Sequence, residues 1–140
     1  MPQEVLALLF AAVISSTSNF AIWFNVARDV ARDRLLSLVD AARVYALLSA
    51  TINDSLQTAH ASKFVYGLWR PVTAIRRADE DLNALTEADP SWLPLLITPP
   101  YPSHSSNMAC VGAGAARSLA DVFGTNDIAI TARWYDNTAG

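Results

Sequence analysis

The sequence predicts an all-α protein built as a helical bundle, and three observations predict it. Ala and Leu dominate a composition that holds only five Gly. Apolar residues recur at intervals of three and four along several segments, which is the period of one helix face. Residues that favour helix starts and stops flank those segments. With 140 residues, 52% of them apolar, the chain suits a single helical domain spanning 1–140 that buries its own core.

The first amphipathic segment runs over 19–34, and its polar residues gather on the side opposite the apolar ones. The apolar residues are Ile22, Trp23, Val26, Ala27 and Val30. An apolar run precedes this segment, from Val5 to Ile14. That run is too short to cross a bilayer and has no basic region in front of it, so we expect a helix packed on the core rather than a membrane span or a signal peptide.

The next predicted helix extends from Leu38 to about Trp69. Ser37 followed by Asp40 resembles a capping box, which marks a helix start. The segment is apolar nearly all round, so we expect it to be the central, buried helix of the bundle. Its polar residues would then need hydrogen-bonding partners in the interior. These residues are Asn53, Asp54, Gln57 and His60.

Composition and spacing argue against several classes of function. The net charge is −3 and no basic stripe stands out, so nucleic acid is not an expected partner. A single cysteine, Cys110, excludes an intrachain disulfide and an all-cysteine zinc site. His60 has no second histidine or carboxylate at metal-ligand spacing, so we interpret it as a core or rim histidine and predict no metal site. We expect a soluble chain, and the sequence leaves its compartment open.

Two cations, Lys63 and Arg70, stand seven residues apart in an otherwise apolar and aromatic run. On one continuous helix this spacing is close to two turns, so both side chains would leave from nearly the same face. Arginine offers a planar fork to an oxyanion and lysine offers a point charge, so together they could bind one small anion. The spacing alone also fits two cations that reach water from the rim of a buried helix.

A helix of small residues is predicted from Ala109 to Phe123, closed by Gly124. Three prolines keep the approach to it extended, and Ser106 is well placed as its N-cap. The backbone N–H groups of its first turn and the helix dipole favour a bound anion. A well-capped packing helix without an anion is the alternative interpretation.

These residues together resemble a known family. Lys63, six further residues, Arg70-Pro71 and the following Thr73-Ala74-Ile75-Arg76 are similar to the first signature of the superfamily of vanadium-dependent haloperoxidases and type-2 phosphatidic acid phosphatases. An aromatic residue and Trp before Arg-Pro are typical of its soluble bacterial haloperoxidase-related branch. The resemblance covers about 25–124 and implies a helical bundle of the vanadium haloperoxidase and acid phosphatase type. It also implies a cationic cradle, with Lys63 and Arg70 in it, for vanadate or phosphate.

The second family signature, Pro-Ser-Gly-His, can be placed in two registers. Read without a gap, Ser106, Asn107 and Met108 stand where the family has Ser, Gly and His. Read from Pro102, His104 keeps the histidine but the glycine is deleted. The first register needs no deletion and implies that Ser106 and the Asn107 N–H contact the oxyanion. Methionine cannot carry a proton, so His104 is then the candidate catalytic imidazole, reaching inward from its loop.

The third family signature, Ser-Arg, five residues and His, has no match in these 140 residues, because no histidine follows Arg133. We therefore expect an incomplete bundle, a fragment of a longer phosphatase or haloperoxidase domain, that keeps part of the oxyanion site and is inactive alone. Vanadate, or phosphate in its place, is expected as a cofactor only of the intact family member.

Two functions stay open at this stage. The resemblance implies either halide oxidation by peroxide on vanadate or hydrolysis of a phosphate ester through a phosphohistidine. The alternative is a non-catalytic helical domain for structure or self-association, in which case a homo-oligomer is expected. The large apolar share of the chain favours that alternative.

Overall fold

The computed structural model describes residues 19–130, which form helices and connecting segments without a strand in that range. Its elements are α2 (Asn19–Asp33), α3 (Leu38–Tyr66), α4 (Pro71–Arg76), the short 3-10 helix η1 (Ala78–Glu80) and α5 (Asn107–Phe123). The predicted all-α fold is confirmed. The predicted helix over Val5 to Ile14 and the residue Arg133 lie outside the described residues.

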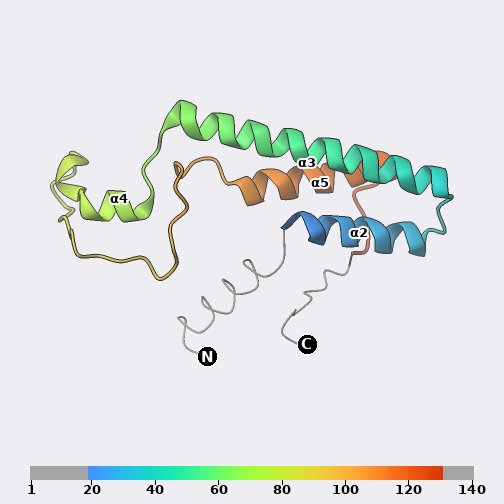
Figure 1. Ribbon diagram of the computed structural model, residues 1–140, viewed down its shortest axis with the longest axis horizontal. Coiled ribbons are helices and arrows are strands. Elements are labelled where there is room, and N and C mark those ends of the chain that lie inside the picture. The colour runs from blue at the N-terminus through green and yellow to red at the C-terminus, as the bar shows by residue number, and fades with distance from the viewer. Residues whose placement is uncertain (1–18, 131–140) are drawn as a thin grey trace. The chain divides into compact units, whose positions relative to one another are not determined.

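The chain divides into two compact units. Unit 1 contains the described residues up to Leu56 and those from Met108 onward, and unit 2 is Gln57–Asn107. In unit 1, α2, α5 and the first part of α3 lie side by side around one apolar core (Figure 1). The fully buried members of that core are Val26, Ala27, Val30, Val44, Leu48, Ile52, Val111, Ala115 and Leu119.

Small residues let α5 approach α3 closely inside unit 1. A Cβ atom added at Gly114 would overlap the hydroxyl of Ser55 and would lie 3.3 Å from the methyl group of Thr51. A Cβ atom at Gly112 would lie 3.7 Å from the Trp23 ring, an ordinary contact distance. Of these two glycines, Gly114 is therefore the one at which a side chain would force Ser55 to move.

The start of α3 is the one that its sequence predicted. The backbone N–H of Asp40 donates to Ser37 Oγ at 3.1 Å, and the Ser37 hydroxyl donates to the Asp40 carboxylate at 2.6 Å. These bonds satisfy one of the backbone donors that a helix leaves unpaired in its first turn. The end of α5 is also determined by a neighbouring residue, because Gly124 follows Phe123 and adopts the left-handed conformation with a φ of 66°.

The expectation that α3 is buried all round is wrong for the described residues. One stripe of the helix is buried, consisting of Val44, Leu48, Ile52, Ala59 and Lys63. Elsewhere on the helix, Leu38 is 87% exposed and Val39 is 76% exposed. Asn53, Asp54 and Gln57 are exposed as well and do not need interior partners. On α3, the core of unit 1 is made of Val44, Leu48 and Ile52, with Tyr45 and Leu56 packed against it, and apolar residues such as Leu38 on other faces stay uncovered.

The predicted extension of α3 to Trp69 is also wrong, because the helix ends at Tyr66. Gly67 adopts the left-handed conformation, with a φ of 58°, and its N–H donates to the Lys63 carbonyl at 2.9 Å. This is a glycine stop at the position after the helix. A new helix, α4, then begins at Pro71 with Arg70 extended in front of it, at φ −73° and ψ 155°. Proline favours that first helical position because its missing N–H would be unpaired there in any case.

Unit 2 consists of the last turns of α3, then α4, η1 and a long irregular segment that returns to the end of α3. Two hydrogen bonds join α4 to the irregular segment: Asp89 N–H donates to Ile75 O at 3.0 Å, and Arg76 Nε donates to Trp92 O at 2.8 Å. A third hydrogen bond, from the Ser103 N–H to the Leu68 carbonyl at 2.9 Å, joins the end of the irregular segment to the residues that follow α3. Among the helices of 19–130, none is long and apolar enough to cross a membrane.

Candidate functional site

Lys63 lies in the last turn of α3 and is only 2% exposed. Its ammonium group donates two hydrogen bonds of 3.1 Å, one to the carbonyl of Pro102 and one to that of Ser103. A buried charge is costly unless hydrogen bonds compensate it, and carbonyl oxygens do so here. Lys63 is therefore fixed in place rather than extended along the surface, which removes the rim-cation interpretation for this residue.

Arg70 follows Gly67 in the chain and contacts the same segment as Lys63, the residues Tyr101–Ser103. Its Nε donates to the Tyr101 carbonyl at 2.7 Å. The Tyr101 ring lies against both cations, with its centroid 4.8 Å from Arg70 Cζ and 5.1 Å from Lys63 Nζ. The two cations converge on Tyr101–Ser103, but not for the reason that the spacing predicted. The turn at Gly67 brings Arg70 back toward this segment, and a continuous helix does not exist there.

A hollow of about 430 Å³ borders this pair of contacts, lined by residues from 67–73 and 98–102. Arg70 and Tyr101 are both in its lining. Within residues 19–130, the guanidinium of Arg70 makes its protein hydrogen bond through Nε, which leaves the N–H groups of its two terminal nitrogens, in the plane of the guanidinium, for another acceptor. A water molecule takes about 30 Å³, so the hollow has room for a small solvated anion.

The second predicted contact region starts where α5 begins at Asn107, directly after Ser106. Ser105, one residue earlier, shares a hydrogen bond of 2.9 Å with the hydroxyl of Ser62 on α3. The Asn107 side-chain nitrogen lies 3.5 Å from His60 Nε2, and its side-chain oxygen is buried without a hydrogen-bond partner. Ser106 and Asn107 thus follow closely on the segment that Lys63 and Arg70 hold.

The two histidines of the chain occupy different surroundings. His104 is exposed, and its ring stands edge-on to Tyr66 at 5.8 Å. His60 is half-buried, edge-on to Tyr101 at 5.7 Å, and lies beside Asn107. The role of His104 as the catalytic imidazole stays a prediction, and His60 is the histidine that borders the other candidate residues.

Sequence reasoning interpreted His60 as a core or rim histidine and did not place it beside the other candidate residues. The signal was present in the spacing from His60 to Lys63, since residues three apart are neighbours on a helix surface. Among residues 19–130, no three His, Cys, Asp or Glu side chains gather as a metal-binding group. The chemistry that this arrangement offers is charge and hydrogen bonding toward an anion.

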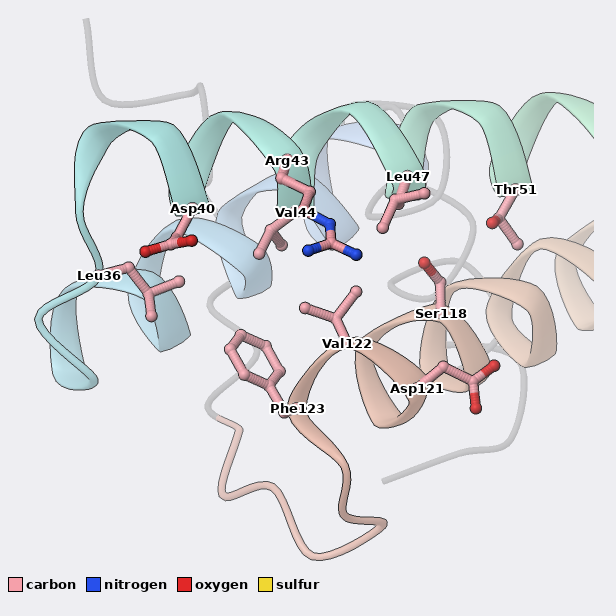
Figure 2. Close-up of a pocket in the computed structure, with 10 residues that line it drawn as sticks. All are labelled: Leu36, Asp40, Arg43, Val44, Leu47, Thr51, Ser118, Asp121, Val122 and Phe123. Atoms are coloured by element: carbon pink, nitrogen blue, oxygen red, sulfur yellow. The ribbon is translucent and has the colours of Figure 1, made fainter.

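A second hollow lies in unit 1 and contains none of the predicted site residues. It measures about 490 Å³ and lies between the first half of α3 and the end of α5 (Figure 2). Asp40, Arg43 and Asp121 surround it with charges of both signs, and Val44, Val122 and Phe123 supply apolar walls. Such a mixed lining offers no concentration of positive charge to an oxyanion.

Comparison with known protein families identifies the family to which this chain belongs. The family model described as the VCPO second helical-bundle domain matches residues 43–139, which is more than half of the chain. No curated protein and no solved structure matched the chain. The matched range includes α4, α5 and all but the first turns of α3, and with them Lys63, Arg70, Ser106 and Asn107. The chain therefore belongs to the vanadium haloperoxidase superfamily, with the helical-bundle domain of VCPO type.

Proposed function

We propose that unit 2 binds a small tetrahedral oxyanion, phosphate or vanadate, beside Lys63, Arg70, Ser106 and Asn107. One observation carries this proposal: a buried lysine in the last turn of α3 and an arginine from the extended link before α4 converge on the three residues Tyr101–Ser103. Those residues lead directly into the start of α5. The family is vanadate-dependent in general, which supports an oxyanion as the ligand.

Each residue has a distinct role in this proposal. Arg70 binds two oxygens of the anion through its terminal nitrogens, since its Nε already holds the Tyr101 carbonyl. Lys63 acts mainly through its charge, which its low exposure protects from screening by solvent. The Ser106 hydroxyl and the Asn107 N–H donate to the remaining oxygens.

The residues present fit the oxygens of vanadate better than its metal centre. Lys63, Arg70 and Ser106 offer charge and donors to oxygens, but in the register without a gap Met108 stands where the family signature has histidine. When bound, vanadate supplies a Lewis-acid centre for activating peroxide. We therefore propose that these 140 residues bind the oxyanion without turnover, and that halide oxidation or phosphate-ester hydrolysis belongs to family members with the full set of signatures.

Calorimetric titration with phosphate, and separately with vanadate, tests the binding site. We expect Arg70→Gln to weaken binding about 10-fold or more, because a hydrogen bond to a charged group contributes about 1.5–3 kcal/mol. Arg77→Gln is the matched control. It removes the same charge from the same unit, but Arg77 is half-exposed, pairs with Glu80 and lowers the pKa of that carboxyl below its usual value through their hydrogen bond.

Two outcomes would contradict the proposal. One is the absence of binding by the wild-type chain at about millimolar phosphate and vanadate, a level at which even weak sites are occupied. The other is an equal loss of affinity in Arg70→Gln and Arg77→Gln, which would mean that only net charge matters.

A specific observation also favours the second candidate function, self-association. Five large apolar or aromatic side chains are exposed around the end of α3 in unit 2: Phe64 69%, Val65 77%, Tyr66 65%, Leu68 53% and Trp69 41%. Large exposed apolar side chains gathered in one stretch of sequence are a common feature of protein interaction sites. We propose that a second copy of this chain covers these side chains. Sedimentation velocity should show a dimer or larger species that Phe64→Ser dissociates, and a wild-type monomer at all concentrations would overturn this candidate.

A further inference from the structure

The side-chain amide of Asn107 has an unusual environment at the proposed anion site. Its Oδ1 is buried and has no hydrogen-bond partner in the described part of the chain. A buried acceptor left unpaired is costly, and in native proteins such a group is usually paired with an ordered water, an ion or a ligand. The unpaired oxygen belongs to the first residue of α5, next to Ser106. A ligand that donates a hydrogen bond there would satisfy it.

The orientation of this amide follows from His60. Asn107 Nδ2 faces His60 Nε2 at 3.5 Å, so Nδ2 donates and Nε2 accepts when the imidazole carries its proton on Nδ1. The edge-on contact between the His60 and Tyr101 rings, at 5.7 Å, restrains the imidazole in turn. With Nδ2 directed at His60, Oδ1 is the end of the amide that remains for a ligand.

We infer that Asn107, positioned by His60, makes the site select oxyanions that carry a hydroxyl group over those that do not; this inference rests on the proposed function. Hydrogen phosphate and hydrogen vanadate each have an O–H that can donate to Asn107 Oδ1. Sulfate has only acceptor oxygens at the same pH. Its approach would set two acceptors against each other and leave both desolvated, whereas a hydroxyl-bearing anion completes the hydrogen bonding of the site.

The test compares hydrogen phosphate with sulfate by calorimetric titration of the whole 140-residue chain at about pH 8, where both anions carry two negative charges. Equal size and charge leave the hydroxyl as the main difference. We expect the wild-type chain to bind phosphate about 10-fold more tightly than sulfate, the factor that one satisfied hydrogen bond commonly gives. Asn107→Leu should reduce this ratio to about 1 by removing the acceptor.

His60 is tested by variants that separate its hydrogen bond from its bulk. His60→Gln places an acceptor near the position of Nε2 and should retain the phosphate preference, whereas His60→Leu frees the amide to turn and should lower the preference at least about 3-fold. A purely structural role of His60 would instead make Gln and Leu behave alike.

The outcomes distinguish this inference from the proposal beneath it. If the wild-type chain binds phosphate and sulfate with equal affinity, the inference is overturned while the oxyanion site stands. If Asn107→Leu keeps the phosphate preference, the inference is overturned as well. If neither anion binds, both fail together. The wild-type comparison needs no substitution, so an unfolded variant cannot hide a negative result.

Discussion

The ring of Tyr101 should hold the two cations of unit 2 in place, and replacing that ring should loosen both. Its centroid lies 4.8 Å from Arg70 Cζ and 5.1 Å from Lys63 Nζ. A cation within about 6 Å of an aromatic centroid is attracted by the negative face of the ring. The same face also offsets the repulsion between two like charges that converge on one segment. Tyr101→Leu keeps apolar bulk and the backbone carbonyl that accepts from Arg70, but it removes this face.

The size of the effect follows from burial. A cation–π contact contributes about 0.5–1 kcal/mol at an exposed site and about 2 kcal/mol when desolvated. Lys63 is 2% exposed, so it falls at the desolvated end of that range, and half-buried Arg70 falls at the lower end. Together we expect Tyr101→Leu to lower the free energy of unfolding of the chain by about 2–3 kcal/mol. Tyr101→Phe should lower it by less than about 0.5 kcal/mol, because the face remains.

Urea unfolding followed by circular dichroism measures the stability, and phosphate titration of the folded variants measures the site. We expect phosphate affinity to fall about 3- to 10-fold in Tyr101→Leu and to stay unchanged in Tyr101→Phe. A double-mutant cycle supplies the control: in an Arg70→Gln background, the stability loss from Tyr101→Leu should shrink by about 0.5–1 kcal/mol. If Leu and Phe at this position give the same stability and the same affinity, the ring does not hold the cations and the reasoning fails.

Three predictions concern helix ends and packing, all measured as the free energy of unfolding in urea. Gly67→Ala should cost about 1 kcal/mol, since a Cβ there has open space but a φ of 58° disfavours it; no loss would contradict the glycine stop. Gly114→Ala should destabilise unit 1 through its overlap with Ser55, and adding Ser55→Ala should recover most of the loss; equal effects in both backgrounds would refute the close approach. Ser37→Ala should cost about 1 kcal/mol, and Ser37→Asp, which keeps a capping oxygen before Asp40, should not.

The parts of the fold that the sequence predicts are those that local chemistry decides. The Ser37 cap, the amphipathic period of α2 and Gly124 after α5 each involve residues within a few positions of one another. Such interactions have the same energy in most contexts, so their sequence signals are dependable. The small residues of α5 belong to the same class, because Gly114 predicts a close neighbour without specifying which one.

The sequence predicted the end of α3 wrongly because two signals in that stretch favour different structures. Between Lys63 and Arg70, continuous apolar residues favour helix and Gly67 opposes it; the glycine prevails because Pro71 prevents the helix from continuing through Arg70. Burial of α3 was overestimated for another reason. An apolar residue such as Leu38 shows that a partner is possible, but not that the described chain supplies one.

The candidate site shows that a wrong geometry can still single out two residues that lie against one segment. Lys63 and Arg70 were joined by a supposed two-turn spacing that does not exist, yet both bind carbonyls of Tyr101–Ser103. These bonds couple the cations to the segment that leads into Ser106. The cations therefore need little reorganisation when an anion arrives, and preorganised groups bind more tightly because their ordering cost is met on folding. It follows that the backbone of Tyr101–Ser103, whose carbonyl oxygens accept from both cations, would determine where the anion is held.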